Sequence, residues 1–268
     1  METFNGNGYK VARFRIKNSD CNYNYILWCV ETNKCVVIDP IDPVLLLNFI
    51  RENDLKVAYV INTHAHPDHI SGNDPIIKVF LSSKILIHKN ASDRVSPRSD
   101  TIDEGDQVSF GKQKLDVIFT PGHAPEHICL IIGDHIFVGD TLFLAGCGNT
   151  KFRGNAIDLF ESLTYKLKVL PENLRILCGH DYAEKNLMFS IKVEPENKFA
   201  INKLESIKKL KSENKAPDPT SIGEELTYNP FLRLDKSAII KFANKINPEI
   251  GNNQDQIFKE LRELRNNW

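Results

Sequence analysis

The spacing of apolar residues changes character along the 268-residue chain. Up to about residue 180, short apolar runs rich in β-branched and aromatic residues alternate with turn residues, which is typical of β-strands. The run 56–61 is almost continuously apolar, as expected for a strand covered on both faces. The predicted strands cover residues 9–16, 25–38 with a turn at 32–34, 56–61, 85–88, 113–119, 127–132, 135–138 and 175–178.

Two segments with helical periodicity lie among these strands, and only helical periodicity is found from residue 181 onward. Helices are predicted over residues 44–53, directly after Pro43, and over about 156–169. From residue 181 onward the patterns are helical only, and they include a segment with Ile201, Leu204, Ile207 and Leu210 on one face. The pattern therefore predicts an α/β domain over residues 1–180 and a smaller all-helical domain over residues 181–268. The helices predicted in the second domain cover residues 184–194, 197–214 and 255–268.

Composition and charge narrow the class of protein. A hydrophobic fraction of 41% supports a substantial core, and a formal net charge of −1 gives no reason to expect a nucleic-acid or membrane partner. The six cysteines form no C-x-x-C pair, the first ten residues lack the pattern of a signal peptide, and no apolar run approaches the length of a membrane span. We therefore expect a cytoplasmic protein. The lysines of the C-terminal part alternate with Glu and Asn, which favours a solvated helix face over a nucleic-acid patch: Lys192, Lys198, Lys203, Lys208, Lys209, Lys211 and Lys215.

The segment VINTHAHPDHISG, residues 60–72, is unusual because a run of β-forming residues is followed directly by three histidines and an aspartate. Neutral histidine is a metal ligand near pH 7, so this spacing indicates a metal site. The alternative is a loop whose histidine rings only bond the backbone. The four candidate ligands are His64, His66, Asp68 and His69.

Three further predicted strands end in the same way. His123 in FTPGHAPEHI, Asp140 in HIFVGDTLF and His180 in RILCGHDY each follow a strand and a glycine. Glycine before the ligand lets the backbone turn sharply at little steric cost. Four strand ends that each supply a metal-competent side chain predict a metal centre at a sheet edge. A mixture of imidazole and carboxylate suits zinc and also iron or manganese.

The order H-x-H-x-D-H, then a single His, Asp and His, resembles the metallo-β-lactamase superfamily. The resemblance implies an αββα sandwich with two divalent metal ions at one edge of its two sheets. It implies that Asp140 bridges the ions and that a metal-bridging hydroxide, oriented by Asp68, is the nucleophile. The implied ligands are His64, His66 and His123 for the first ion and Asp68, His69 and His180 for the second.

The segments CNYNYIL, GDTLFLAGCG, CGHDYAEKNL, ELTYNPFLR and FKELRELRNNW resemble glyoxalase II, the hydroxyacylglutathione hydrolases, from about residue 20 to the C-terminus. This resemblance implies hydrolysis of S-D-lactoylglutathione and related 2-hydroxyacyl thioesters to glutathione and D-lactate, the second step of methylglyoxal detoxification. It also implies which residues grip glutathione: Lys151, Phe152, Tyr182, Arg262 and Arg265. We also expect a monomer, although nothing in the sequence decides the oligomeric state.

Two residues beside the ligands have open roles. His127 is either a second-shell residue that hydrogen-bonds a ligand or a plain buried histidine. Asp39, at the end of a predicted strand, either orients a ligand or begins a turn.

The sequence departs from the glyoxalase II pattern in several places. Glu126 stands where glycine is usual, and two extra residues precede Lys151. The other departures are Ala65 and Pro67 between the first ligands, Arg153 in place of an aromatic residue, and Arg265 in place of lysine. A glutathione-persulfide dioxygenase or another hydrolase of the same fold is the alternative function. The complete ligand set and the C-terminal helices favour the thioesterase.

Overall fold

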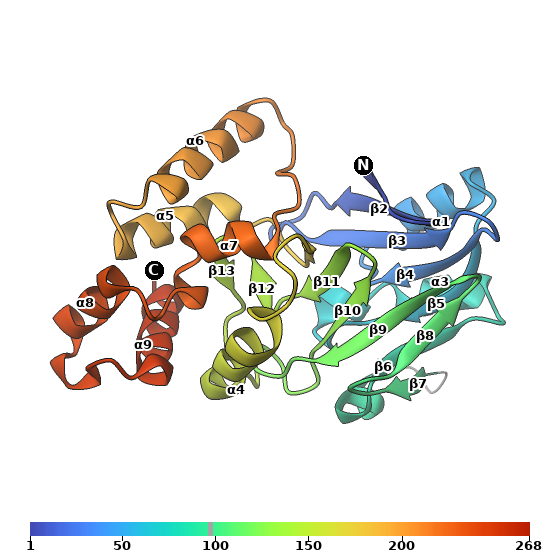
Figure 1. The fold of residues 1–268 in the computed structure, drawn as a ribbon. Helices are drawn as coiled ribbons and strands as arrows, with labels where there is room; N and C mark the ends of the chain where they lie inside the picture. The colour runs from blue at the N-terminus through green and yellow to red at the C-terminus, as the bar shows by residue number, and fades with distance from the viewer. Residues whose placement is uncertain (96–98) are drawn as a thin grey trace. The chain divides into compact units, whose positions relative to one another are not determined.

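The computed structural model describes residues 1–95 and 99–268, drawn in Figure 1. The contacts between Cα atoms group the described residues into two units. Unit 1 comprises Met1–Phe119 and Glu126–Gly139, and unit 2 comprises Thr120–Pro125 and Asp140–Trp268. This grouping assigns residues 140–180 to the same unit as the C-terminal helices. The domain boundary after residue 180 is a different division and stays a prediction.

Unit 1 is built mainly of strands. Its helical elements are α1 (Pro43–Glu52), α2 (Pro67–Ile70), α3 (Asn73–Val79) and the 3₁₀ segment η1 (Lys89–Arg94). Its strands are β1 (Glu2–Asn5), β2 (Tyr9–Arg15), β3 (Tyr23–Cys29), β4 (Lys34–Ile38), β5 (Lys56–Ile61), β6 (Lys84–His88), β7 (Ser99–Ile102), β8 (Gln107–Phe110), β9 (Gln113–Phe119), β10 (Ile128–Ile132) and β11 (His135–Gly139).

The first sheet of unit 1 has seven strands in the order β1-β2-β3-β4-β5-β6-β7. The pairs from β1 to β4 are antiparallel, and those from β4 to β7 are parallel. Parallel neighbours need a crossover connection, and α1 and α3 provide it between β4 and β5 and between β5 and β6. The carboxyl ends of β4, β5 and β6 therefore lie at the same edge of the sheet.

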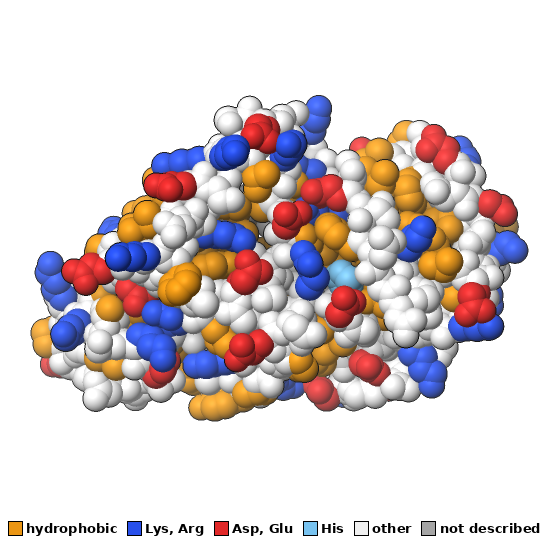
Figure 2. Space-filling model, turned by 45° about the horizontal axis from the view of Figure 1, so that its top comes forward, with side chains coloured by type: hydrophobic (Ala, Val, Ile, Leu, Met, Phe, Trp, Pro, Cys, Tyr) orange, Lys and Arg blue, Asp and Glu red, His pale blue; other side chains and the backbone are white. Residues whose placement is uncertain are grey.

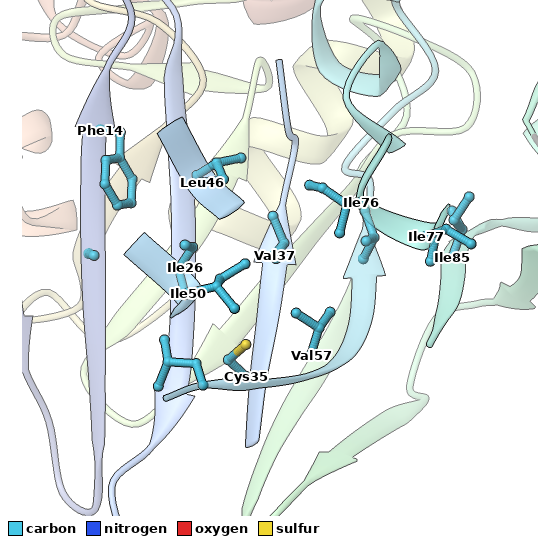
Figure 3. Packing of buried hydrophobic residues seen from close by; sticks show 13 residues of the cluster. Phe14, Ile26, Cys35, Val37, Leu46, Ile50, Val57, Ile76, Ile77 and Ile85 are labelled. Atoms are coloured by element: carbon cyan, nitrogen blue, oxygen red, sulfur yellow. The ribbon is translucent and has the colours of Figure 1, made fainter. Parts of the chain in front are cut away.

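Helices α1 and α3 cover one face of this sheet. Figure 3 shows Leu46 and Ile50 of α1 among Ile26 and Val37 of the strands, and α3 contributes Ile76 and Ile77 to the same buried cluster. Side chains alternate along β3, so Tyr25 points to the opposite face, where its ring meets Phe137 of β11 at 5.3 Å between centroids. The second sheet of unit 1, with the order β11-β10-β9-β8, packs there.

Unit 2 is mainly helical. A two-stranded hairpin and one short strand precede a run of helices, in agreement with the helical pattern expected after residue 181. Helices α5 and α6 pack on the hairpin through Leu144, Leu187 and Ile207. Its elements are β12 (Leu142–Phe143), β13 (Gly146–Cys147), α4 (Ala156–Glu161), η2 (Ser162–Leu167), β14 (Arg175–Cys178), α5 (Ala183–Val193), α6 (Lys198–Ser212), α7 (Ile222–Tyr228), η3 (Pro230–Leu232), α8 (Ser237–Ile246), η4 (Pro248–Ile250) and α9 (Gln254–Asn266).

Every strand and helix predicted from the sequence is present, with ends that shift by one or two residues in most cases. The helix expected over 156–169 is instead α4 followed by the π-helical turn η2, Ser162–Leu167. The short strands β1, β7 and β8 and the ten-residue helix α8 were not predicted. Among the described residues, no helix has the length and apolar character needed to cross a bilayer.

The lysines of α6 lie on a solvated face, as the sequence predicted. Lys211 pairs with Glu184, and Lys203 lies 3.1 Å from Glu224. Across the face drawn in Figure 2, Lys and Arg side chains interleave with Asp and Glu.

Candidate functional site

One group of candidate metal ligands lies in a turn of unit 1 that follows the carboxyl end of β5. Pro67 at the first position of α2 starts this single-turn helix, and the helix carries Asp68 and His69. His64 Nε2 lies 3.0 Å from His66 Nδ1, and His69 Nε2 lies 3.7 Å from Asp68 Oδ2. His64 and His69 are almost completely buried. The four candidate ligands of the sequence motif are thus gathered by local backbone geometry.

Asp39, at the end of β4, orients two of these ligands. Its carboxylate accepts hydrogen bonds from Thr63 N at 2.8 Å and Thr63 Oγ1 at 2.6 Å, and it lies 2.9 Å from His69 Nδ1. Thr63 Oγ1 also lies 3.1 Å from His64 Nδ1. With Nδ1 of both rings engaged in this way, each Nε2 is left for a metal ion.

The backbone of Asp39 is unusual as well. Its φ of 48° lies in the left-handed region, where aspartate is among the residues that are tolerated. Asp39, His64 and His69 also offer three ligand atoms within 4.8 Å of one another. Because the Asp39 oxygens already accept from Thr63 and face His69, orienting the ligands is the role that its contacts describe. Of the two roles left open for Asp39 by the sequence, the geometry therefore supports the first.

Two asparagines missed by sequence reasoning support the candidate ligands of unit 1. Asn22 Nδ2 donates to Asp68 O at 3.2 Å and to Asp68 Oδ2 at 3.1 Å. Asn24 Nδ2 donates to Asp39 O, and its Oδ1 accepts from the backbone of residues 41 and 42. Both asparagines are buried. Their only sequence signal is the segment CNYNYIL, where polar residues interrupt an otherwise apolar strand.

His127 packs beside the ligand turn. Its ring stacks on His64 with centroids 5.0 Å apart and an interplanar angle of 24°. Gly139 makes room for this contact, since a Cβ there would lie 2.5 Å from Thr63 Oγ1 and 2.6 Å from His127 Nε2. That His127 hydrogen-bonds a metal ligand stays a prediction. The structure adds that its ring packs on His64.

Unit 2 holds a second group of candidate metal ligands. Asp140 Oδ2 lies 3.5 Å from His123 Nε2 and 3.1 Å from His180 Nε2, and all three residues are buried. His123 Nδ1 lies 2.8 Å from Asn149 O, a geometry in which the ring donates to that carbonyl. Nε2 of His123 is then the nitrogen left to ligate.

Two glycines permit this approach. A Cβ at Gly122, whose φ is 138°, would lie 2.3 Å from the backbone of Leu159. A Cβ at Gly148 would lie 2.1 Å from Asp140 O and 2.8 Å from His123 Nδ1. The Pro-Gly-His segment therefore needs glycine at position 122, because the backbone of Leu159 packs directly against it.

The residues implied in thiol binding differ in their surroundings. Tyr182 stacks on His180 with centroids 4.9 Å apart, and Lys151 Nζ donates to Asn266 O at 2.7 Å. Phe152 is 65% exposed.

The two arginines of α9 also differ. Arg262 is only 4% exposed, and its Nη1 donates to Cys147 O at 2.8 Å and Gly148 O at 3.1 Å. Arg265 Nη2 donates to Asn186 Oδ1 at 3.0 Å, and its buried Nε has no hydrogen-bond partner within the part of the chain that the structure describes. Burial and the charge of Arg262 lower the pKa of Arg265.

The donor set fits divalent metal ions. Two ligand atoms bound to one zinc ion at tetrahedral angles lie about 3.3 Å apart, since zinc–nitrogen and zinc–oxygen bonds are about 2.0–2.2 Å long. Within each unit, the pairs of candidate ligand atoms lie 3.0–3.7 Å apart.

Burial raises the pKa of the Cys147 thiol, which therefore stays neutral and is a poor nucleophile.

Comparisons with known proteins match the chain from residue 19 onward. Residues 19–180 match the family model of the metallo-beta-lactamase superfamily, and residues 181–268 match that of the hydroxyacylglutathione hydrolase C-terminus. A hydroxyacylglutathione hydrolase of Nitrosococcus oceani is 36% identical over 262 residues, covering 94% of this chain and 97% of its own. A relative from Arabidopsis thaliana, named hydroxyacylglutathione hydrolase cytoplasmic, is 33% identical and covers 88% of this chain and 95% of its own.

A solved structure agrees with these matches. The ETHE1 protein of Myxococcus xanthus is 26% identical with a TM-score of 0.68, covering 95% of this chain and 97% of its own. Together the comparisons confirm the predicted fold class, a metallo-β-lactamase domain followed by helices.

Proposed function

Because the chain belongs to the hydroxyacylglutathione hydrolase family of the metallo-β-lactamase superfamily, we propose that it hydrolyses S-D-lactoylglutathione and related 2-hydroxyacylglutathiones to glutathione and the free acid. The observation that carries the proposal is the match of both parts of the chain, and above all of the helical residues 181–268, to this one family. The fold alone would not suffice, since one fold hosts many reactions.

The metal ligands proposed are the seven residues of the sequence motif: His64, His66, Asp68, His69, His123, Asp140 and His180. The donor distances within each unit support this assignment. Two divalent ions, proposed to be zinc, would supply an activated water at neutral pH and polarise the thioester carbonyl. Iron and manganese remain the alternative metals.

The chain's own residues prepare this chemistry. Asn22 holds the Oδ2 atom of Asp68, and Asp39 fixes the orientation of His69 directly and that of His64 through Thr63. Glutathione leaves as a thiolate. Because the pKa of its thiol is near that of free cysteine, about 8.5, the thiolate is a stable leaving group and no side chain has to protonate it.

Thiol binding is proposed for Lys151, Phe152, Tyr182 and Arg265. Glutathione carries two carboxylates, and the guanidinium of the partly exposed Arg265 is a donor suited to one of them. Arg262 is proposed to act indirectly, because its guanidinium already donates to the carbonyls of Cys147 and Gly148. It would then hold the loop that leads to Lys151.

We also propose that the protein acts as a cytoplasmic monomer. The cytoplasmic name of the Arabidopsis relative supports the compartment. Light scattering of the purified protein during size-exclusion chromatography tests the monomer.

The function is tested by following the loss of thioester absorbance with S-D-lactoylglutathione. We expect turnover by the wild type, loss of turnover after chelation, recovery on adding zinc, and near-complete loss in Asp140→Asn. Asp235→Asn is the matched control, because Asp235 is an exposed aspartate paired with Lys236. Nitrocefin should not be cleaved.

Turnover of nitrocefin without thioester cleavage would contradict the proposal. Oxygen consumption with glutathione persulfide would favour the dioxygenase alternative. Full activity in Asp140→Asn would remove Asp140 from the proposed ligand set.

A further inference from the structure

Glu126 is a fully buried carboxylate beside the ligand turn, at a position where the family resemblance leads one to expect glycine. Its Oε1 accepts a hydrogen bond from Arg94 Nη1 at 2.8 Å and another from the amide of Ala65 at 3.3 Å. Its Oε2 is buried without a hydrogen-bond partner among the described residues. Burying an anionic group is costly unless a counter-charge and donors compensate it, so a feature of this kind calls for an explanation.

The amide that Glu126 holds lies between two candidate ligands. Ala65 separates His64 from His66, so the orientation of its peptide group helps to set where both rings point. The side chain of Ala65 is 1% exposed and packs in a small apolar cluster with Ile87 and Ala91, with Val95 at its edge. A bulkier residue at position 65 would have to displace this cluster. The departures at positions 65 and 126 therefore belong to one local arrangement.

Arg94 reaches Glu126 from the end of η1, and η1 is itself anchored. His88, which caps η1, accepts the amide hydrogen of Asn90 on Nδ1 at 3.3 Å, and its Nε2 lies 3.1 Å from Asp103 Oδ1. The His88 ring stacks on Phe119 at 4.2 Å between centroids. A continuous series of contacts therefore leads from the end of β6, through η1 and Arg94, to Glu126 and the backbone between the ligands.

From this geometry we infer that Glu126 and Arg94 are positioning residues that fix the peptide between His64 and His66 and thereby raise the affinity for the first metal ion. The inference rests on the proposed function, since it takes those two histidines as ligands. Neither Glu126 nor Arg94 is itself a proposed ligand. Their effect on metal affinity is transmitted through the Ala65 amide.

The test compares metal affinity in four variants of the full chain. Arg94→Met removes the cation and leaves a buried carboxylate without its counter-charge. Glu126→Gln keeps an acceptor for the Ala65 amide but removes the charge, and the double variant removes both charges. Glu194→Gln is the matched control, because Glu194 forms a comparable partly buried pair with Arg233 at 2.8 Å, within unit 2.

Each protein is stripped of metal and titrated with Zn²⁺ in competition with a chromophoric chelator. We expect Arg94→Met to weaken one of the two zinc sites by about 10–100-fold, the usual effect of removing a group that orients ligands. Glu126→Gln should weaken it less. The double variant should bind better than Arg94→Met, because it leaves no lone buried charge. Glu194→Gln should bind zinc like the wild type.

A purely structural ion pair would give a different result. It would lower the free energy of unfolding of the metal-free protein and leave zinc affinity unchanged in every folded variant, and that result overturns the inference. If Arg94→Met does not fold, Glu126→Gln and the double variant decide by the same criterion. A wild-type protein that binds no zinc would contradict the proposed function instead, so the two failures are distinguishable.

Discussion

The ligand turn of unit 1, residues 62–69, and the loop of unit 2 at residues 149–154 represent opposite ways of building a functional segment. In the turn, His64 and His69 are buried, and their Nδ1 atoms face Thr63 and Asp39. In the loop, Lys151, Phe152 and Arg153 are exposed. The turn is held by contacts from several strands, whereas the loop exposes the side chains proposed to bind the thiol.

This difference follows from what each segment has to do. Metal ligands must hold a fixed geometry to within a fraction of an ångström, which requires a dense surrounding network. A substrate-gripping loop tolerates insertions and substitutions because few contacts depend on it. Of the departures in the loop, the two extra residues before Lys151 are therefore expected to alter thiol recognition more than the reaction itself.

The largest effect is expected at Asp39, because it orients both His64 and His69. Asp39→Asn keeps a residue that tolerates the left-handed backbone but weakens acceptance from Thr63 and His69. We expect zinc affinity to fall by about 10–100-fold, with a matching loss of kcat. Asp42→Asn is the control, since asparagine also caps α1 well. Equal zinc affinity in Asp39→Asn and the wild type would contradict the orienting role.

The second effect concerns Glu225, which shows that unit 2 also contains a densely bonded polar group. Glu225 is fully buried and accepts from Ala145 N, Thr220 Oγ1, Tyr228 Oη and Asn229 Nδ2. Burial raises the pKa of Glu225 from 4.5 to about 7. The folded state therefore holds this proton more tightly than the unfolded state, so Glu225 lowers stability as pH rises from about 4.5 to about 7.

Glu225→Gln should remove this pH dependence. Relative to the wild type, the variant should gain up to about 3 kcal/mol in the free energy of unfolding between pH 5 and pH 8, since one pKa unit corresponds to about 1.4 kcal/mol. Urea unfolding at several pH values measures it. Glu224→Gln is the control, because glutamine also completes the capping box of α7. If the free energy of unfolding changes with pH in the same way for Glu225→Gln and the wild type, the prediction is wrong.

A smaller effect is expected at Arg262, the buried residue that supports the loop. Arg262 Nη1 donates to Cys147 O and Gly148 O while its Nε donates to Asn266 Oδ1, and the single nitrogen of a lysine cannot take the place of both donor atoms. We expect Arg262→Lys to raise KM about tenfold and to lower the free energy of unfolding by about 1–3 kcal/mol. Arg265→Lys, by contrast, should change KM less than about twofold, because a lysine retains the positive charge. If both variants behave alike in steady-state kinetics, the distinction between the two arginines is wrong.

The smallest effect is expected at Arg153, which is exposed and has a φ of 68°. Arg153→Gly relieves the strain of a side chain on a left-handed backbone. Its free energy of unfolding should therefore be about 1 kcal/mol higher than that of Arg153→Ala. Arg153→Ala compared with the wild type isolates the charge, and its KM for the glutathione thioester should change less than about twofold. A large rise in KM would show that Arg153 binds an anionic part of the substrate.

Much of the fold could be read from the sequence because the signals were local. The strand from Lys56 to Ile61 and the helix from Lys198 to Ser212 follow from periodicity within one segment. The short strands β1 and β7 could not be predicted in this way, since four residues carry no clear period and depend on neighbours in the sheet. The π-helical turn η2 likewise replaces the second half of the helix expected over residues 156–169.

The candidate site divides in the same way. By itself the sequence determined the candidate metal ligands, their order and their position after strands, because each lies in a short segment with its own turn chemistry. Only the tertiary structure decided that Asn22 and Asp39 support the ligands, that Arg262 is turned inward, and that Glu126 meets Arg94. These contacts join residues tens of positions apart, and such pairings are fixed by how strands and helices pack, which no local pattern encodes.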